Sequence, residues 1–441
     1  MRRITLAGPK SARILPKTVA ACLADDVLDL PYNWPKKVRS VVLGICLARS
    51  TVLQDIARML GRDSVKKSEK ALSEFLRCKK LDLRGSSWKH TVKMLRRMGK
   101  KRFRRYRGKI VLIVDATTYA KVRSRGKQRR MPLIGKVLLH NVPTKEKVLV
   151  PGYTEFWTGL LLKDETCLGI TRRLYTEHTL PTSGFSQNAL EEIEIRSAVD
   201  LVKEAFGVGV ILVADRGFRR KDLLAWLKKD VRADFVIRIE GKLTVKARGW
   251  KGLLKDLAPQ WKERLRRHWR DNNKDPILAE VRGQAVEIPL GGKSKDHVGI
   301  NVVHLTPVNR KGLDPMFLAT TLPIEERSEL SRVVSLYSKR WTIETFFTNW
   351  KQSLGATAFR VFSCWDAIDR LLTMAHMAFL VLHLLYALGQ EATRGAMAAL
   401  WRRLENLLLQ WVARPPELTR GQFFDMLAMD SAPPRWVWVA R

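Results

Sequence analysis

Two short runs of aliphatic and β-branched residues limit most strongly how this chain can fold. The runs IVLIV, at 110–114, and VILVA, at 210–214, each have the length and composition of a buried strand. Each run is followed directly by an aspartate, Asp115 in the first case and Asp215 in the second. We therefore expect two carboxylates at the ends of two central strands, held rigidly and close together.

Paired carboxylates of this kind suit a metal ion that prefers oxygen ligands. Mg²⁺ takes such ligands and usually keeps water and substrate phosphate in its coordination shell. Two-metal cleavage of a phosphodiester needs this arrangement, because one ion activates the nucleophile and the other stabilises the leaving oxygen. The alternative is that each aspartate only caps or turns its strand, and the two aspartates alone do not decide between these interpretations.

A third polar feature lies in YSKRWTIETFFTNWK, at residues 337–351. Tyr337, Arg340, Glu344 and Lys351 have spacings that bring them within about 60° of one another on a regular α-helix. Glu344 would stay ionised between two cations, and the cations would hold phosphates on either side of a metal site. A surface helix with charge pairs would explain this spacing too, but it has no need of two aspartates at buried strands.

The net charge of the chain predicts a polyanionic partner. Its 81 Lys and Arg residues exceed its 43 Asp and Glu residues, which gives a formal charge of +38. Such a charge repels itself in a folded protein, and DNA or RNA offsets it by releasing counterions. A small ribosomal-type protein is disfavoured, because 441 residues with 46% hydrophobic content can bury a large core. The densest basic run lies between Lys93 and Lys109.

The order of patterns along the chain predicts an α/β fold with a mixed sheet. We expect a helical region over 1–100 and a catalytic core built from 105–240 and 324–365. A β-rich insertion of short strands and turns is expected over 241–323. Residues 366–441 are predicted to form a helical C-terminal region that ends in a polar tail containing proline.

Within the N-terminal region, two amphipathic segments outline a helix-turn-helix. Val52, Ile56 and Leu60 lie on one apolar stripe, and residues 61–63 interrupt the pattern. A second helix is expected over 64–77, with lysines on its first exposed turns. The outline fits DNA recognition, but any two packed helices look similar, and both interpretations stay open.

One apolar segment tests whether the chain has a membrane span. Residues 371–388 approach the ~20 apolar residues that cross a bilayer, but they include His376 and His383 and follow Asp369 and Arg370. We interpret the segment as a helix buried on all sides, with both histidines in the core and no membrane partner. The five cysteines are far apart and form no CxxC pair, which is typical of a reducing cytosol.

With these residues in place, the sequence resembles the insertion-sequence-four type of bacterial DDE transposases. The pattern Tyr337-x2-Arg340-x3-Glu344-x6-Lys351 matches the Y-R-E-K signature of that family. The segment VDATTY looks like the family's first aspartate region, and VADRGF looks like its second. The order is also similar: two aspartates, a β-rich insertion, then glutamate on a helix. The resemblance covers 110–351.

The resemblance implies an RNase H-like catalytic core in a DNA transposase. Such an enzyme cleaves transposon ends and joins their 3′-hydroxyl ends to target DNA by metal-dependent transesterification. The resemblance implies two Mg²⁺ ions, which Mn²⁺ can replace. Their implied ligands are Asp115, Asp215 and Glu344. The resemblance also implies that the DNA phosphates near the cleaved end are contacted by Tyr337, Arg340 and Lys351.

Further properties that the resemblance implies concern partners and location. Members act on double-stranded DNA as a homodimer in a synaptic complex, in the bacterial cytoplasm and at the nucleoid when bound to DNA. Some members form a hairpin intermediate and use a tryptophan of the insertion to stabilise a flipped base. Trp250, Trp261 and Trp269 lie in that region, although core packing is the competing interpretation for each.

Two other functions stay open at this point. A transposase-derived protein that binds DNA but no longer cuts would have the same charge and fold. Another RNase H-like nuclease, such as a resolvase, would share the metal chemistry but would not transfer strands. The presence of all three carboxylates disfavours the first alternative.

Overall fold

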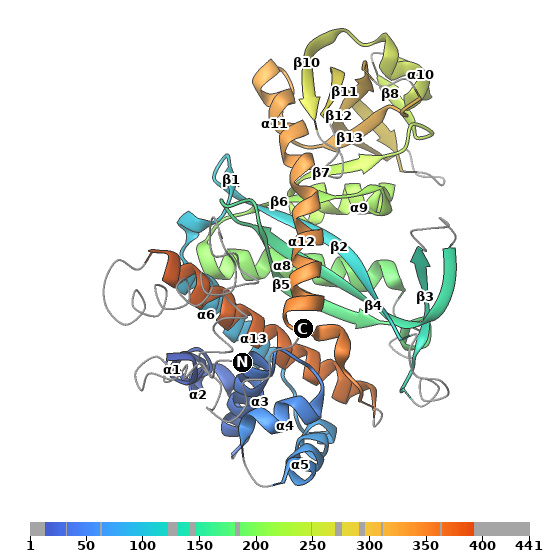
Figure 1. Cartoon of the computed structure of the whole chain (residues 1–441). Helices are drawn as coiled ribbons and strands as arrows, with labels where there is room; N and C mark the ends of the chain where they lie inside the picture. The colour runs from blue at the N-terminus through green and yellow to red at the C-terminus, as the bar shows by residue number, and fades with distance from the viewer. Residues whose placement is uncertain are drawn as a thin grey trace, which may run out of the picture.

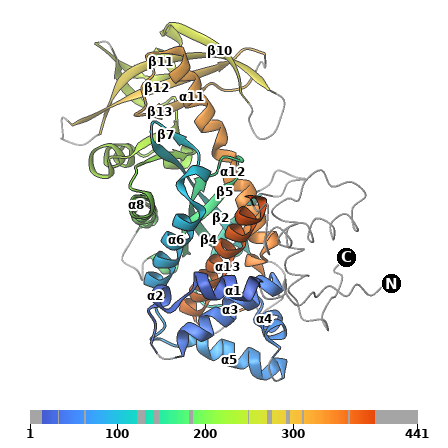
Figure 2. The same ribbon diagram turned by 90° about the vertical axis from the view of Figure 1, so that its left-hand side faces the viewer.

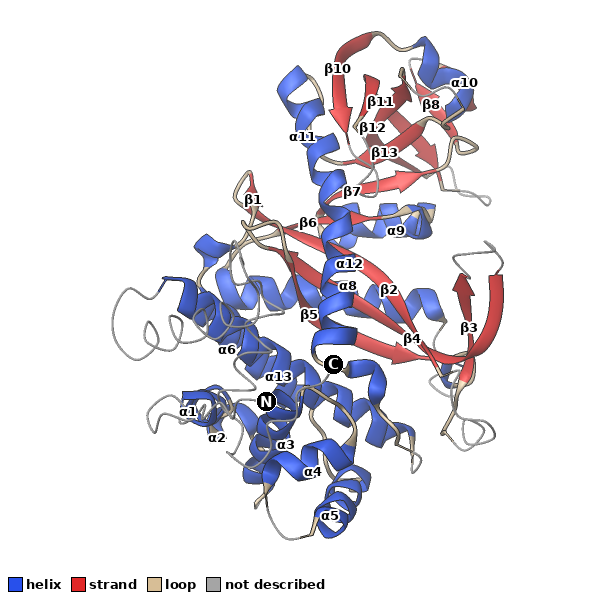
Figure 3. Ribbon diagram, in the orientation of Figure 1, coloured by secondary structure: helices blue, strands red, loops and turns tan. Residues whose placement is uncertain are grey.

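The computed structural model shows a mixed sheet with helices gathered at one end and a β-rich unit at the other (Figures 1 and 3). The predicted α/β class with a helical N-terminal region is confirmed, and the arrangement is consistent with an RNase H-like fold. The structure describes residues 14–31, 33–61, 64–121, 131–140, 147–180, 186–247, 249–269, 276–290, 296–309, 312–361 and 364–391.

The N-terminal region is helical, as its periodicity predicts. Gly61 ends the fourth helix at φ +61°, a left-handed conformation that glycine adopts without strain. Ser64 caps the next helix by accepting a hydrogen bond from the backbone N–H of Lys67. Lys66 and Lys70 are exposed on that helix, and its role in DNA recognition stays a prediction. The helices are α1 (Ile14–Cys22), α2 (Asp25–Leu28), α3 (Trp34–Ala48), α4 (Leu53–Leu60), α5 (Val65–Arg77) and α6 (Arg84–Met98).

The core sheet is built around β2 (Lys109–Ala120). This strand pairs in parallel with β6 (Val210–Ala214), which pairs in parallel with β7 (Asp234–Ile239). On its other edge β2 pairs antiparallel with the long strand β4 (Lys147–Leu161). The remaining elements of the core are η2 (Lys100–Arg102), β1 (Arg105–Tyr106), β3 (Gly135–His140), β5 (Cys167–Tyr175), α8 (Gln187–Phe206), α9 (Lys221–Trp226) and η5 (Leu227–Val231).

Strand β5 is not predicted by the pattern of its residues. Its Arg172 and Arg173 interrupt the apolar pattern that marks the other central strands. Consecutive residues of a strand point to opposite faces of the sheet. Arg172 accordingly pairs with Glu155 and with Asp369, which belongs to the helix α13 (Trp365–Glu391), whereas Arg173 pairs with Glu194 of α8. A buried strand can carry these charges because each has an opposite partner.

The β-rich insertion continues the core sheet instead of standing apart from it. Its last strand, β13 (Met316–Thr320), pairs antiparallel with β7, so hydrogen bonds run unbroken from core to insertion (Figure 2). The other elements of the insertion are β8 (Thr244–Ala247), β9 (Trp250–Leu253), α10 (Leu254–Leu257), η6 (Ala258–Gln260), β10 (Glu263–Trp269), β11 (Ile277–Pro289) and β12 (His297–Pro307).

The tryptophans of the insertion have unequal surroundings. Trp250 is 74% exposed, so core packing is the wrong interpretation for that residue. Its strand, β9, is short and lies at the end of the strand order, where few side chains can cover an indole. Trp261 is partly buried against the core. The side chain of Trp269 lies outside the described residues.

The long apolar segment forms the central helix α13 (Trp365–Glu391), which lies among the N-terminal helices (Figure 1). By length and hydropathy alone α13 could cross a membrane, but 89% of its apolar window is buried inside the protein. Helices α3 and α4 pass the same test only as a pair, and they are bent by 101° at their break. The structure therefore agrees with a buried helix, while residues 392–441 of the predicted C-terminal region lie outside the described ones.

Two buried histidines lie where α6 faces α13. His90 is fully buried, and neither of its ring nitrogens has a hydrogen-bond partner among the described residues. Burial lowers the pKa of His90 to about 3, and burial lowers the pKa of His376 to about 4. Both pKa values fall below that of an unfolded histidine, so the unfolded chain binds more protons under pH 6.5. The stability that depends on keeping these two histidines neutral is therefore fully present above pH 6.5 and is lost as the pH falls toward 4.

We expect His90→Leu to make the protein less sensitive to acid. Each buried neutral histidine should lower the free energy of unfolding by about 1.4 kcal/mol per pH unit below 6.5. Between pH 7.5 and pH 5 the variant should thus lose roughly 2 kcal/mol less than the wild type. Denaturant unfolding at the two pH values measures this difference, with pH 7.5 as the internal control. Equal losses in both proteins would contradict the burial of a neutral imidazole.

Candidate active site

The parallel pairing of β2 with β6 places the two predicted aspartates beside each other. The last pair in the register is Ile113 with Val213. Asp115 and Asp215 each follow two residues later, so they take equivalent positions on adjacent strands. The sequence prediction that the two carboxylates lie near one another therefore agrees with the strand register.

The backbone around the two aspartates differs, and for Asp115 it corrects the prediction that its strand ends there. Strand β2 continues beyond Asp115 because it keeps pairing with β4, where Trp157 is the opposite residue. Strand β6 does end, and Asp215 caps the 3-10 turn η4 (Arg216–Phe218). Its Oδ1 accepts a hydrogen bond of 2.7 Å from the backbone N–H of Gly217. One carboxylate is thus fixed by a sheet and the other by a turn.

The four residues of the Y-R-E-K pattern lie on one helical run, but the run is not a regular α-helix. A 3-10 turn contains Arg340, and a π-helical turn contains Lys351. These turns change the rotation per residue, so the predicted stripe at 100° per residue is wrong in detail. Tyr337 and Arg340 are only 4% and 6% exposed, whereas the Glu344 side chain is 53% exposed. The run consists of α11 (Arg327–Ser338), η7 (Lys339–Trp341), α12 (Thr342–Thr348) and η8 (Asn349–Ser353), and η9 (Ala356–Ala358) follows it.

Arg340 joins this helical run to the sheet. Its Nη1 donates a hydrogen bond of 3.1 Å to Oδ2 of Asp115, and its Nη2 lies 4.0 Å from Oε1 of Glu344. The guanidinium therefore stands between a carboxylate of the sheet and a carboxylate of the helix. It is also stacked near Trp341, 4.0 Å from the ring centroid. A buried guanidinium in this position offsets the repulsion between the acids around it.

Asp115 is coupled electrostatically to both of the other predicted carboxylates. Burial raises the pKa of Asp115 to about 6. The charge of Arg340 opposes this rise, while the negative charges of Asp215 and Glu344 add to it. Asp115 therefore responds to both other acids, which is the behaviour expected of carboxylates that face a common space.

The other two residues of the pattern contact the same part of the sheet. Burial raises the pKa of Tyr337, whose charged neighbours include Arg340, Arg238 and Asp215. Lys351 donates a hydrogen bond of 2.9 Å from Nζ to the backbone oxygen of the β2 residue Thr118. Both side chains thus lie at the aspartate-bearing strands, and their contact with DNA phosphate stays a prediction.

Sequence reasoning missed basic groups that lie on the elements following Asp215. Arg238 of β7 donates a hydrogen bond to Tyr337. A hollow of about 410 Å³ opens beside Gly217. Four cations and one acid line it, among them Arg219, Lys221 and Lys242. The signal in the sequence was the run RGFRRK after the second strand, in which basic residues follow the aspartate directly.

The carboxylates fit Mg²⁺ or Mn²⁺ in their chemistry. They are hard oxygen donors, and their negative charges act on one another at Asp115. Their placement is looser than we predicted. Among the residues that the structure describes, no group of three or more His, Cys, Asp or Glu side chains is arranged to hold a metal ion. The Arg340 guanidinium lies between Asp115 and Glu344.

Comparison with known protein families supports a transposase. Residues 190–380 match the model of a family described as the transposase DDE domain. The matched segment contains Asp215 and Glu344 and begins after Asp115. No curated protein matches the chain.

We expect Arg340→Met to destabilise the protein by roughly 3 kcal/mol, because it leaves a largely buried carboxylate without its cation. Asp115→Asn should restore part of the loss when it is combined with Arg340→Met, since it removes the charge that Arg340 offsets. Denaturant unfolding of the two single variants and the double variant at pH 7.5 measures the coupling. Simple additivity of the two effects would show that Arg340 and Asp115 do not depend on each other.

Proposed function

We propose that this chain is a DDE transposase of the insertion-sequence-four type, which cuts transposon ends and joins them to target DNA. The observation that carries the proposal is geometric: Asp115 and Asp215 follow adjacent parallel strands, and Arg340 joins Asp115 to Glu344 of the facing helix. The DDE-domain match over the second and third of these residues supports it. So does the charge of +38, which calls for double-stranded DNA as partner.

In this proposal the three carboxylates hold Mg²⁺ or Mn²⁺, as two ions. Bound there, the ions supply Lewis-acid activation of the nucleophile and charge stabilisation at the leaving oxygen. Arg340 and Lys351 already make charge-assisted contacts, to Asp115 and to a backbone oxygen. When DNA binds, a phosphate oxygen would replace the protein oxygen that each cation now contacts. Tyr337 would likewise contact a DNA phosphate near the cleaved end.

The reaction consists of two displacements at phosphorus. Water attacks the phosphodiester at the transposon end, and the bond to the 3′-oxygen of that end breaks, leaving a 3′-hydroxyl. That hydroxyl then attacks a phosphodiester of the target, and the target's own 3′-oxygen leaves. The protein supplies position and fixed charge, which are the main sources of catalysis in phosphoryl transfer.

Several wider features belong to the same proposal. We infer a homodimer in the synaptic complex, with each copy holding a transposon end. The exposed lysines of α5 and the basic hollow beside Gly217 are the candidate surfaces for the DNA backbone. The bacterial cytoplasm, with the nucleoid as the site of action, is the proposed location.

Glu344→Gln should abolish cleavage while DNA binding survives. The change keeps size and hydrogen bonding but removes a charge that holds the metal. We expect a rate loss on the order of 10³-fold, because metal ions supply several kcal/mol of transition-state stabilisation. Lys351→Ala should instead weaken binding or misplace the cleaved end, since a charge-assisted contact is worth on the order of 1.5–3 kcal/mol.

Gel-shift and nicking assays on a duplex that contains a transposon end, with Mg²⁺ or Mn²⁺, measure both effects. Glu326→Gln is the matched control, because Glu326 is an acid of the same region that caps α11. Near wild-type nicking by Glu344→Gln would remove Glu344 from the site. Strand transfer of a pre-cut end separates a transposase from another RNase H-like nuclease, and an absence of all cleavage would favour a DNA-binding relative.

DNA affinity should fall steeply with salt, because phosphate contacts dominate binding by so basic a chain. If about six phosphates are neutralised, the affinity should drop by about 10³-fold between roughly 50 and 200 mM salt. Titration of a labelled duplex at a series of salt concentrations gives the slope. An affinity that stays constant over this range would contradict a binding mode based on phosphate contacts.

A further inference from the structure

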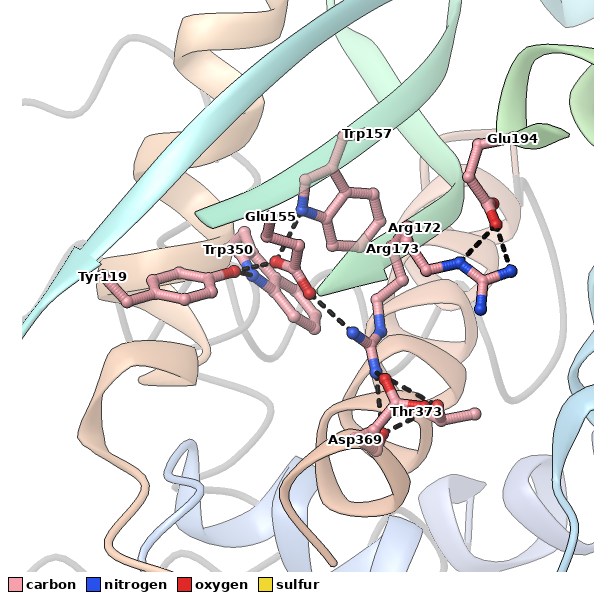
Figure 4. Close-up of polar contacts among 9 residues, drawn as sticks. All are labelled: Tyr119, Glu155, Trp157, Arg172, Arg173, Glu194, Trp350, Asp369 and Thr373. Atoms are coloured by element: carbon pink, nitrogen blue, oxygen red, sulfur yellow. Dashed lines mark hydrogen bonds and ion pairs between the residues drawn. The ribbon is translucent and has the colours of Figure 1, made fainter. Parts of the chain in front are cut away.

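A fully buried acid, Glu155, lies on the strand next to the one that carries Asp115 (Figure 4). Its Oε2 accepts a hydrogen bond of 2.7 Å from Nε1 of Trp157, and its Oε1 accepts one of 2.7 Å from Nη1 of Arg172. The hydroxyl of Tyr119 also donates to Oε2. Nothing in the catalytic proposal so far uses this carboxylate, although a buried charge is costly unless it is paired.

The partner of Glu155 connects it to the central helix. Arg172 of β5 donates from Nη2 to the backbone oxygen of Asp369 at 2.7 Å and to Oδ1 of the same residue at 2.8 Å. It also reaches the hydroxyl of Thr373 at 3.1 Å. One guanidinium therefore joins two strands of the sheet to α13, as Figure 4 shows.

The hydrogen bonds around Glu155 form a network that also reaches the helical run of the candidate site. The Tyr119 hydroxyl donates to Glu155 and accepts a hydrogen bond of 2.6 Å from Nε1 of Trp350. Tyr119 belongs to β2, four residues after Asp115, and Trp350 belongs to the π-helical turn beside Lys351. The network thus ties the strand of one proposed ligand to the turn that presents a proposed phosphate contact.

Ring packing holds the same helix close to the sheet. The Trp157 ring lies opposite Asp115 in the register, and its centroid is 4.8 Å from that of Phe346 and 4.9 Å from that of Trp350. Gly169 makes room for this approach, because a Cβ there would lie 2.4 Å from the Phe346 ring. Apolar packing fixes the distance between helix and sheet, but rings alone allow a helix to slide along its axis. The directional hydrogen bonds of the network restrict that movement.

Resting on the proposed function, we propose that Glu155 is a positioning residue for the transposase reaction. Through Tyr119 and Trp350, its fixed charge sets where residues 342–353 sit along β2. This placement brings Glu344 and Lys351 into register with Asp115. Stability alone gives no reason for such a network, because replacing buried ion pairs by apolar residues is often neutral or stabilising. Its use is geometric: a misplacement of about 1 Å can cost about 10²-fold in rate.

The test is a pair of identical chemical changes at neighbouring tyrosines. Tyr119→Phe removes the hydroxyl between Trp350 and Glu155 and keeps the ring. Tyr153→Phe is the matched control, because Tyr153 is the cross-strand partner of Tyr119 and is equally buried. Its hydroxyl instead donates to the backbone oxygen of Pro132, at 3.0 Å and away from the helix.

Two readouts are needed. The first is the single-turnover cleavage rate at saturating duplex with Mg²⁺, together with the duplex Kd from gel shifts. We expect Tyr119→Phe to lower the rate by about 10- to 10²-fold with a Kd within about twofold of the wild type. The second is backbone hydrogen exchange over 342–353 without DNA or metal, which Tyr119→Phe should accelerate and Tyr153→Phe should leave unchanged. A purely structural role would lower the melting temperature of both variants without this split between rate and Kd.

The outcomes separate the two proposals. A wild type that cleaves, with a Tyr119→Phe variant that cleaves equally fast, overturns the positioning role alone. A wild type that does not cleave overturns the proposed function, and hydrogen exchange over 342–353 then decides whether the network anchors the helix. Unchanged exchange in Tyr119→Phe overturns the anchoring. Glu155→Gln, which keeps the shape but removes the charge, provides the same comparison if Tyr119→Phe does not fold.

Discussion

The candidate site depends first on the parallel hydrogen bonding between β2 and β6. This pairing fixes Ile113 opposite Val213, and Asp115 and Asp215 follow at equal distance along their strands. A shift of the register by one residue would turn one of the carboxylates to the other face of the sheet. Residues 110–114 and 210–214 are buried on both faces of the sheet, so a shifted register would also bring the polar residues that flank them into the core. The apolar character of the two runs therefore protects the geometry of the acids that follow them.

The acids of the candidate site need an opposing charge, and Arg340 provides it at Asp115 and Glu344. Its guanidinium is almost fully buried and contacts acids from the sheet and from the helix. In the proposed function, Arg340 would have two uses, as the internal partner of Asp115 and as a contact to phosphate. The two uses compete for the same donors.

Much of the fold follows from the sequence, and the exceptions have physical causes. The strands at Asp115 and Asp215 and the buried α13 were predictable because their continuous apolar runs leave few alternatives. The β-rich insertion was predictable because short candidate strands alternate with turn residues. Strand β5 was not, because Arg172 and Arg173 look like surface residues until their partners from distant segments are known.

Within the site, the pattern led to Glu344, but spacing alone could not reveal the 3-10 and π turns around it. A change of one hydrogen bond along a helix leaves no signature in residue type. The role of Glu155 could not be predicted either, because its partner Arg172 lies on another strand. A lone acid in an apolar strand is usually a sign of exposure, and only the fold shows that it is enclosed.

The hydrogen bonding of β13 to β7 has a consequence for how this architecture could be shortened. Without residues 241–323, β7 would become the last strand of the sheet, with an unpaired row of N–H and C=O groups along Val236–Ile239. That strand is apolar and buried at Val236, Ile237 and Ile239, so its bare edge would be a template for another chain to pair with. A trimmed version would need a charged or proline-bearing border there to prevent this edge-to-edge pairing.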